Sequence, residues 1–236
     1  MTVEEYLEII KQAGRLKTTM RHCWLDMPAD NNDEAEHGSV CDKMSLPCGS
    51  DEKSETGPVR QSGSDEESAS GPVRRRESVA EHSWRIALMA MLLRGEAEFA
   101  DVDLDKVVRM CLIHDLGESF TGDIPAFLKS DEDAGEETDI FKRWIDHFPE
   151  PQRGEWLSLL AEMEALETQE ARIYKAFDKV EALIAHNESD LSTWLPLEYD
   201  LQLTYGQENM KFSPFFQELR NCVDQWTAQK TGGENK

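Results

Sequence analysis

The chain has 236 residues, enough for one ordinary domain, and its 48 acidic and 25 basic residues give a formal net charge of -23 at pH 7. Such a charge repels phosphate polymers over a wide surface, which excludes a nucleic acid polymer as partner but not a small phosphorylated metabolite bound beside a cation. There is no run of about 18 apolar residues, and the N-terminal sequence MTVEEYLEIIKQAG is acidic and amphipathic, unlike a secretory signal. We therefore expect a cytoplasmic protein without a membrane segment.

The cysteines agree with this location. They are odd in number and widely scattered, without a CxxC pair, which is typical of reduced thiols and not of a disulfide framework. We interpret all five as structural or incidental (Cys23, Cys41, Cys48, Cys111 and Cys222).

The first predicted element is an N-terminal helix. Thr2 and Glu5 have capping-box spacing, and apolar residues follow at helical spacing through Ala13. From about 29 to 74 the composition changes to Asp, Glu, Ser and Gly with few large apolar residues, which predicts a disordered insert. This insert contains a duplicated 14-residue unit, GSDEKSETGPVRQ from Gly49 and GSDEESASGPVRR from Gly63. Residues 1–28 and 75–236 then form a single domain.

The rest of the chain is predicted to be helical. Ser78 and Glu81 form a second capping box before an apolar stripe, Asp103 caps the next helix, and Gly117 ends it. Further helices are expected near 138–148, 155–166, 169–187 and 214–229. No convincing period-2 strand pattern occurs, so the fold class is all-α.

Two helices carry histidine and aspartate on their buried faces. His82 lies on the stripe of Val79 and Ile86, and the doublet of His114 and Asp115 ends the buried face of the following helix. Taken alone, His82 is more often a core histidine bonded to a backbone carbonyl than a metal ligand.

Asp178 lies within the apolar helical sequence IYKAFDKVEALIA, where an unpaired carboxylate is costly to bury. It needs a cation, and pairing with Lys175 or Lys179 on its own helix is as plausible as a metal. Imidazoles and carboxylates together suit Mn, Fe, Co or Zn in the divalent state better than calcium.

The segments around these residues resemble a known family. RRRESVAEHSWRIALMAML, CLIHDLGESFTGDIPAF and IYKAFDKVEALIAH are similar to the HD-domain superfamily, in particular to the small hydrolases that include the bacterial 5'-deoxynucleotidases. The resemblance covers about 1–27 and 75–187 and is weak in the last fifty residues. It implies a helical HD-domain bundle in which a divalent metal is bound by four residues: His82, His114, Asp115 and Asp178.

The resemblance also implies roles for residues beyond the ligands. Glu118 and Asp123, in the loop after Gly117, match acidic residues that are catalytic in the family; solvated loop carboxylates are the weaker interpretation, since both lie in one turn-rich loop directly after the proposed ligands. Arg21 and Trp24 match residues near the substrate phosphate and sugar; a surface arginine and a core tryptophan are about as plausible. His37, His147 and His186 are not assigned to the site, the last two because they lie near helix C-termini.

The function that the resemblance implies is hydrolysis of a phosphomonoester, a (deoxy)nucleoside 5'-monophosphate, to nucleoside and phosphate. Two alternatives remain: another HD phosphohydrolase chemistry, acting on a pyrophosphate or phosphodiester, and a non-catalytic metal-binding regulatory module. The sequence HDLGES lacks the adjacent Glu-Asp pair of the (p)ppGpp hydrolases. Related small hydrolases are commonly homodimers, and a C-terminal apolar stripe fits either core or interface (Phe215, Phe216, Leu219, Val223 and Trp226).

Overall fold

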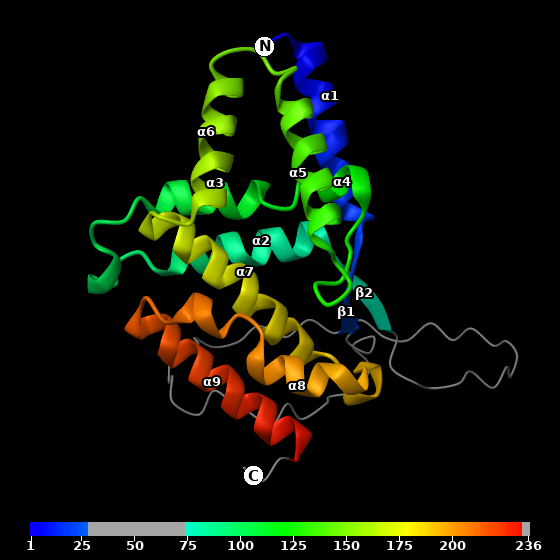
Figure 1. Ribbon diagram of the computed structural model, residues 1–236, viewed down its shortest axis with the longest axis vertical. Helices are drawn as coiled ribbons and strands as arrows, with labels where there is room; N and C mark the ends of the chain where they lie inside the picture. Colours follow the sequence, from blue (N-terminus) through cyan, green and yellow to red (C-terminus); the bar gives the residue numbers. More distant parts are fainter. Residues whose placement is uncertain (28–73, 233–236) are drawn as a thin grey trace, which may run out of the picture. The chain divides into compact units, whose positions relative to one another are not determined.

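The computed structural model describes residues 1–27 and 74–232, and these form one unit. Three helices pack against one another at its centre: α2 (Val79–Leu92), α3 (Leu104–Ile113) and α7 (Gln169–Glu188) (Figure 1). The predicted helical fold class is confirmed. The predicted insert at 29–74 lies outside the described residues except for Arg74, which begins a strand.

Side-chain caps determine where several helices begin. In α1 (Val3–Gly14), the hydroxyl of Thr2 accepts a hydrogen bond from the backbone N–H of Glu5 at 3.1 Å, completing the predicted capping box. Ser78 and Glu81 do the same at the start of α2, and Asp103 caps α3 through the N–H of Lys106 at 2.9 Å. These predicted helix starts are confirmed. Caps of this kind satisfy backbone donors that have no partner inside the helix.

Helix α7 is central because it is apolar on more than one side. It packs on α2 and α3 with one face and on α9 (Pro214–Thr231) with another. The side chains of Phe177, Val180 and Ile173 are at most 2% exposed. The C-terminal apolar stripe belongs largely to this core, since Phe216 and Val223 are buried. Phe215 and Leu219 are partly buried against the core, whereas Trp226 is 38% exposed, so the interface interpretation stays open for the end of the stripe.

The remaining helices surround this centre. They are α4 (Glu118–Thr121), α5 (Asp131–Ile145), α6 (Gln152–Ala165) and α8 (Pro196–Thr204). Helix α5 begins seven residues earlier than predicted, at an acidic first turn capped by Ser130, and α8 was not predicted. In residues 1–27 and 74–232, no helix is both long enough and apolar enough to span a membrane.

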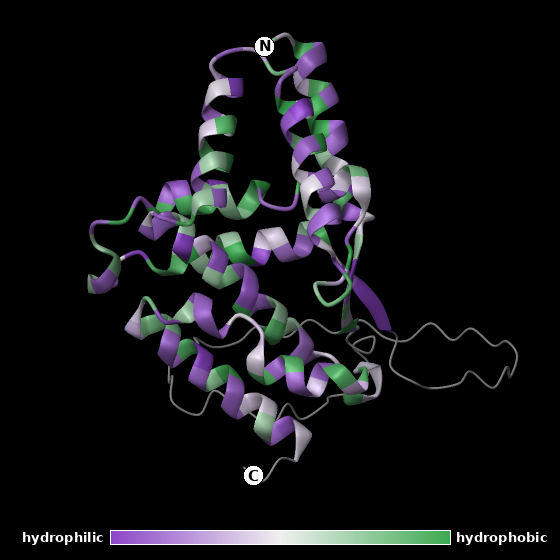
Figure 2. Cartoon of the chain, in the orientation of Figure 1, coloured by the Kyte–Doolittle hydropathy of each residue, from purple (hydrophilic) through white to green (hydrophobic). Residues whose placement is uncertain are grey.

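The structure also contains a short antiparallel sheet that the sequence analysis did not predict. Strand β1 (Met20–Asp26) pairs with β2 (Arg74–Ser78), with an irregular register between Met20 and Trp24. Strand β2 is hydrophilic along its length, as Figure 2 shows, so its hydropathy gives no strand signal. Arg74 pairs with Asp26 at 2.9 Å, and the guanidinium of Arg76 lies 5.3 Å from the ring centroid of Trp24.

Candidate active site

The four predicted metal ligands come together from three helices. The Nε2 atom of His82 on α2 lies 3.3 Å from the Nε2 of His114, 3.7 Å from Asp115 Oδ2 and 3.6 Å from Asp178 Oδ1. His114 Nε2 lies 2.9 Å from Asp115 Oδ2 and 3.9 Å from Asp178 Oδ1. Two imidazole nitrogens and two carboxylate oxygens thus share one small volume.

Hydrogen bonds on the far side of each ring fix the tautomers. His114 Nδ1 donates to the carbonyl of Cys111 at 2.9 Å, and a carbonyl can only accept. His82 Nδ1 donates to the carboxylate of Glu181, which is fully buried. In the neutral rings both Nε2 atoms therefore present lone pairs to the same point. Four acceptors without a hydrogen between them need a positive charge: a metal ion, or in its absence a proton on His82, whose pKa burial and Arg21 lower but Glu181 and Asp178 raise to about 9.

Asp178 can pair with lysines and face the ligand cluster at the same time. Its Oδ2 pairs with Lys175 at 2.8 Å and Lys179 at 3.3 Å, while Oδ1 faces the histidines. Burial favours the neutral acid, but the two lysines and the histidines hold the pKa of Asp178 well below its ordinary value. Burial also favours the neutral acid in Asp115, but His114 and His82 lower the pKa of this carboxyl below its ordinary value. Both carboxylates are ionised and available as ligands.

The geometry fits a divalent transition metal. Ligand atoms about 2.0–2.2 Å from one ion lie roughly 2.9–3.6 Å from one another in tetrahedral or octahedral arrangements. The five separations that join His82 or His114 to another of the four atoms are 2.9–3.9 Å, which overlaps that range. His82, His114 and Asp115 also form a compact group of donor atoms within 4.8 Å of one another. The chemistry of the set is consistent with Mn, Fe, Co or Zn.

Behind His82 lies a buried ionic network that supports its orientation. Glu181 accepts from Arg21 at 3.1 Å and from Arg85 Nε at 2.6 Å, in addition to His82. Arg21 also binds Glu77 at 2.8 Å. The opposing charges outweigh the desolvation of Glu181 and lower its pKa. The network leaves Glu181 charged and fixed, as a carboxylate that orients a ligand histidine must be.

Glu118 and Asp123 lie beside the ligand cluster, as predicted. Glu118 begins α4 and its carboxylate is buried, with Oε2 lacking a hydrogen-bond partner among the described residues. Burial, followed by the charges of Asp115 and Asp123, raises the pKa of Glu118 to about 11. Lys129 opposes this effect from 3.9 Å away. Burial also raises the pKa of Asp123, although Arg21 counteracts it.

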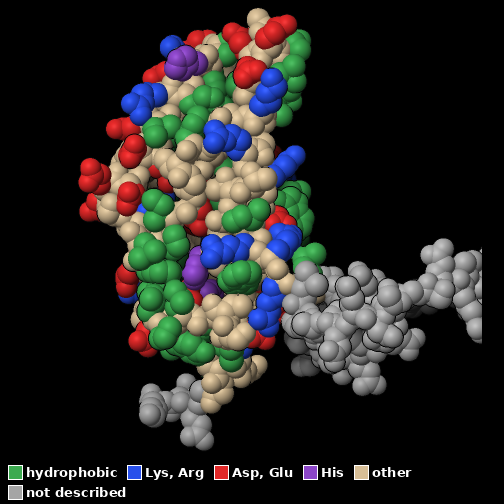
Figure 3. Space-filling model, turned by 90° about the vertical axis from the view of Figure 1, so that its right-hand side faces the viewer, with side chains coloured by type: hydrophobic (Ala, Val, Ile, Leu, Met, Phe, Trp, Pro, Cys, Tyr) green, Lys and Arg blue, Asp and Glu red, His purple; other side chains and the backbone are tan. Residues whose placement is uncertain are grey.

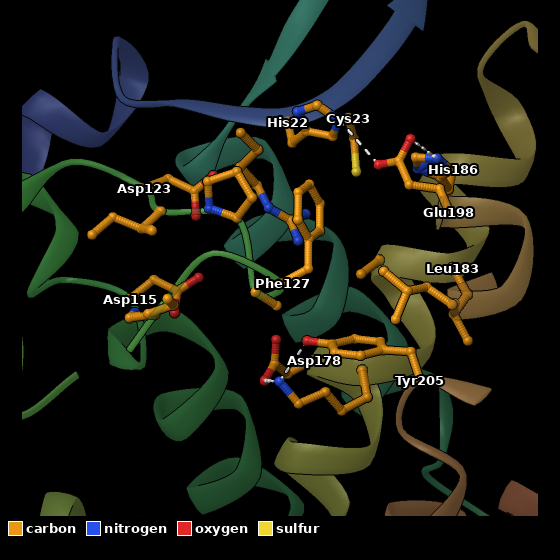
Figure 4. Close-up of a pocket in the computed structure, with 18 of the residues that line it drawn as sticks. His22, Cys23, Asp115, Asp123, Phe127, Asp178, Leu183, His186, Glu198 and Tyr205 are labelled. Carbon is orange, nitrogen blue, oxygen red and sulfur yellow. Dashed lines mark hydrogen bonds and ion pairs between the residues drawn. The ribbon is translucent and has the colours of Figure 1, made fainter. Parts of the chain in front are cut away.

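Asp115, Glu118, Asp123 and Asp178 line a cavity of about 430 Å³. This volume is within the range of roughly 300–1,000 Å³ that is typical of small-molecule sites. Figure 4 shows Asp115, Asp123 and Asp178 around one part of it. Arg21 lines the cavity, whereas Trp24 does not, because its ring lies against Arg76. The sequence analysis did not identify the other polar lining residues, several of which come from distant segments: His22, Lys129, Lys175, Lys179, His186, Glu198, Gln202 and Tyr205.

The comparison with protein families agrees with this geometry. The profile of the family described as "HD domain" matches residues 66–220. The chain belongs to the HD-domain family. The helices that carry His82, His114, Asp115 and Asp178 all lie inside the matched range.

Curated relatives and a solved structure extend the comparison within the HD-domain family. The human protein named 5'-deoxynucleotidase HDDC2 is 33% identical over 116 residues, which cover 48% of this chain and 55% of the relative. The chain therefore matches only about half the length of that relative. The Dictyostelium discoideum protein of the same name is 27% identical over 227 residues, 92% of this chain and 90% of the relative. A crystal structure of a predicted metal-dependent phosphohydrolase from Magnetospirillum magnetotacticum MS-1 has the same fold, with a TM-score of 0.64, 24% identity and coverage of 97% and 94%.

Proposed function

We propose that this HD-domain protein is a metal-dependent phosphohydrolase that converts a (deoxy)nucleoside 5'-monophosphate to nucleoside and phosphate. The observation that carries the proposal is the convergence of His82, His114, Asp115 and Asp178 beside a cavity that the two aspartates line. Relatives named 5'-deoxynucleotidase that match 48% and 92% of the chain support the choice of substrate class.

In this proposal the four residues hold one divalent transition metal. When bound there, such an ion supplies a Lewis acid for a phosphoryl oxygen and a source of hydroxide near neutral pH. His82 and His114 bind through Nε2, and Asp115 and Asp178 through one oxygen each. Lys175 and Lys179 hold the other oxygen of Asp178, which keeps that carboxylate from turning away.

The cavity offers the substrate phosphate four cationic side chains, in a protein of net charge -23, although five carboxylates line it as well. Arg21, Lys129, Lys175 and Lys179 all line it. On the face shown in Figure 3, Lys and Arg side chains gather near a histidine and apolar side chains. We propose that Arg21 contacts the phosphate, since its guanidinium is held in place by Glu77 and Glu181. The contact proposed for Trp24 stays a prediction.

Glu118 and Asp123 are the proposed catalytic residues. With its pKa raised to about 11, Glu118 holds a proton near neutral pH, which an ordinary glutamate does not do, and could pass that proton on as a relay. Its Oε2 atom, which has no partner among the described residues, is the atom that would hold the proton. Asp123 lies across the same cavity and would orient the attacking water or assist the leaving oxygen.

Two further proposals concern the protein as a whole. We propose a cytoplasmic enzyme, because Cys23, Cys111 and Cys222 are free thiols.

We also propose a homodimer, for which the exposed apolar side chains of Trp84, Met91 and Leu92 on α2 offer a surface.

The test is phosphate release by the purified protein. The protein is stripped with a chelator, reloaded with Mn or Co, and assayed with deoxy- and ribonucleoside monophosphates, nucleoside triphosphates and a cyclic dinucleotide. Hydrolysis of the deoxynucleoside monophosphates that depends on added metal is expected. Preferred hydrolysis of triphosphates or diesters would support another HD chemistry. Tight metal binding without release from any member would instead support the non-catalytic module.

A further inference from the structure

The cavity contains a second polar cluster, away from the metal ligands. His22 on β1, His186 at the end of α7 and Glu198 on α8 all line it. His22 Nε2 lies 3.0 Å from Glu198 Oε1, and His186 Nε2 lies 3.3 Å from Glu198 Oε2. Figure 4 shows these three side chains together on one side of the cavity and Asp115 and Asp123 on the other. The cavity therefore has two chemically different ends.

The cluster is buried and incompletely satisfied. Glu198 is 5% exposed and His186 9% exposed, yet neither His22 Nε2 nor His186 Nε2 has a well-aligned hydrogen bond within the described residues. Buried polar groups in folded proteins nearly always have partners, and those that lack them require an explanation. Both Nε2 atoms are enclosed and face Glu198, so a molecule bound at this end of the cavity would meet the accessible parts of the two rings, whose side chains are 23% and 11% exposed.

The walls next to the cluster are apolar and partly aromatic. The ring of Phe127 meets the ring of His22 edge to face, with the centroids 5.6 Å apart. Leu183 and Leu201 also line the cavity. A flat molecule can pack its faces against these side chains while its edge meets the imidazoles and the carboxylate. Among the parts of a nucleotide, only the base is flat, apolar on its faces and polar along its edge.

We infer that the end of the cavity formed by His22, Phe127, His186 and Glu198 is the subsite for the nucleobase of the substrate. This inference rests on the proposed function. If the phosphate of a nucleotide lies at the metal ligands, the nucleobase lies at the other end of the cavity. Phe127 and the leucines contact the face of the base, and the two histidines bind its edge. Glu198 acts through the histidines, as a positioning residue.

The cluster also stabilises the fold, and an experiment must distinguish this effect from binding of the base. Glu198 Oε2 accepts the backbone N–H of Leu195, the N-cap residue of α8, at 2.6 Å. Through His22 and His186, Glu198 further connects β1 and α7 to α8. Loss of Glu198 could therefore lower activity simply by disturbing α8.

The experiment compares substrates with and without a base. Deoxynucleoside monophosphates and 1,2-dideoxyribose 5-phosphate, which keeps the phosphate and sugar ring but lacks the base, are hydrolysed by the metal-loaded full chain. The variants are His22→Asn, His186→Asn and Glu198→Gln, with His147→Asn, in the turn after α5, as matched control. His147 bonds only the backbone carbonyl of Arg143 and does not line the cavity.

For the wild type we expect a higher kcat/KM with the nucleotides than with the baseless phosphate. In His22→Asn and His186→Asn, kcat/KM for at least one nucleotide should fall by about tenfold or more, mainly through KM, with no change for the baseless phosphate. His147→Asn should match the wild type throughout. A parallel fall for both kinds of substrate would overturn the inference in favour of a structural role. Unchanged kinetics in both histidine variants would also overturn it.

The two kinds of substrate distinguish a failure of the base subsite from a failure of the proposed function. If the wild type releases phosphate from neither nucleotides nor the baseless compound, the proposed function itself is wrong. If it hydrolyses both equally well, the enzyme assignment holds and the base subsite is refuted. Glu198→Gln, which keeps its shape and one acceptor oxygen, should show a smaller version of the histidine effect. Thermal unfolding of each variant identifies any that fail to fold.

Discussion

Replacing Glu181 by glutamine tests whether the buried network controls metal binding. The carboxylate of Glu181 is fully buried and accepts hydrogen bonds from His82 Nδ1, Arg21 and Arg85. The amide keeps the shape but removes the charge that holds the His82 ring with Nε2 toward the other ligands. Loss of such a supporting carboxylate typically weakens metal affinity about 10- to 100-fold.

The same contacts indicate how much stability the Glu181→Gln variant loses. Breaking a buried ion pair by removing one partner costs about 3–5 kcal/mol. Both arginines keep a second carboxylate, since Arg21 binds Glu77 at 2.8 Å and Arg85 binds Glu188. We therefore expect the lower end, about 3 kcal/mol, in the free energy of unfolding of the metal-free protein.

Calorimetric titration with Mn or Zn measures the affinity, and urea denaturation measures the stability. Glu188→Gln is the matched control: it removes another carboxylate from Arg85, but its side chain is 40% exposed and does not touch His82. The control should bind metal like the wild type and lose no more than about 1 kcal/mol of stability. Wild-type metal affinity in Glu181→Gln would refute the argument that this carboxylate positions His82.

Three further outcomes are expected. Glu118→Ala should stay folded and metal-bound while turnover falls by ~10² or more, as steady-state assays with metal analysis will show; equal turnover would remove the assignment of Glu118. Metal affinity should weaken as the pH falls through about 9, because His82 coordinates only without a proton on Nε2 and, although burial and Arg21 lower its pKa, Glu181 and Asp178 raise it to about 9; affinities that do not vary with pH would contradict imidazole ligation. Gly206→Ala should lower the melting temperature, since Gly206 has a φ of 70° and an added Cβ would lie 2.6 Å from the Cβ of Lys179; an unchanged melting temperature would show that this turn can relax.

Local patterns in the sequence place the candidate metal ligands on buried helix faces, and the family resemblance assigns them the role of ligands. The spacing of Val79, His82 and Ile86 places the histidine on a buried helix face, and the same holds for Asp178 within α7. That these faces meet was implied by the family resemblance and not by any single helix. The two uses of Asp178, one oxygen for lysines and one toward the histidines, required the three-dimensional arrangement.

Other features had no local signal. Strands β1 and β2 are stabilised by pairing between segments far apart in the sequence and by contacts such as Arg74 with Asp26, which periodicity does not report. His186 was set aside because it lies near a helix C-terminus, yet packing turns its ring into the cavity. Helix α8 could have been predicted from Pro196 at its first position and Glu198 two residues later.

The most direct test of the metal centre is anomalous diffraction from crystals of the protein loaded with Mn or Co. We predict one strong peak about 2.0–2.2 Å from His82 Nε2, His114 Nε2 and one oxygen each of Asp115 and Asp178. A peak elsewhere, or a metal bound without Asp178, would contradict the central claim that three helices assemble one four-residue site.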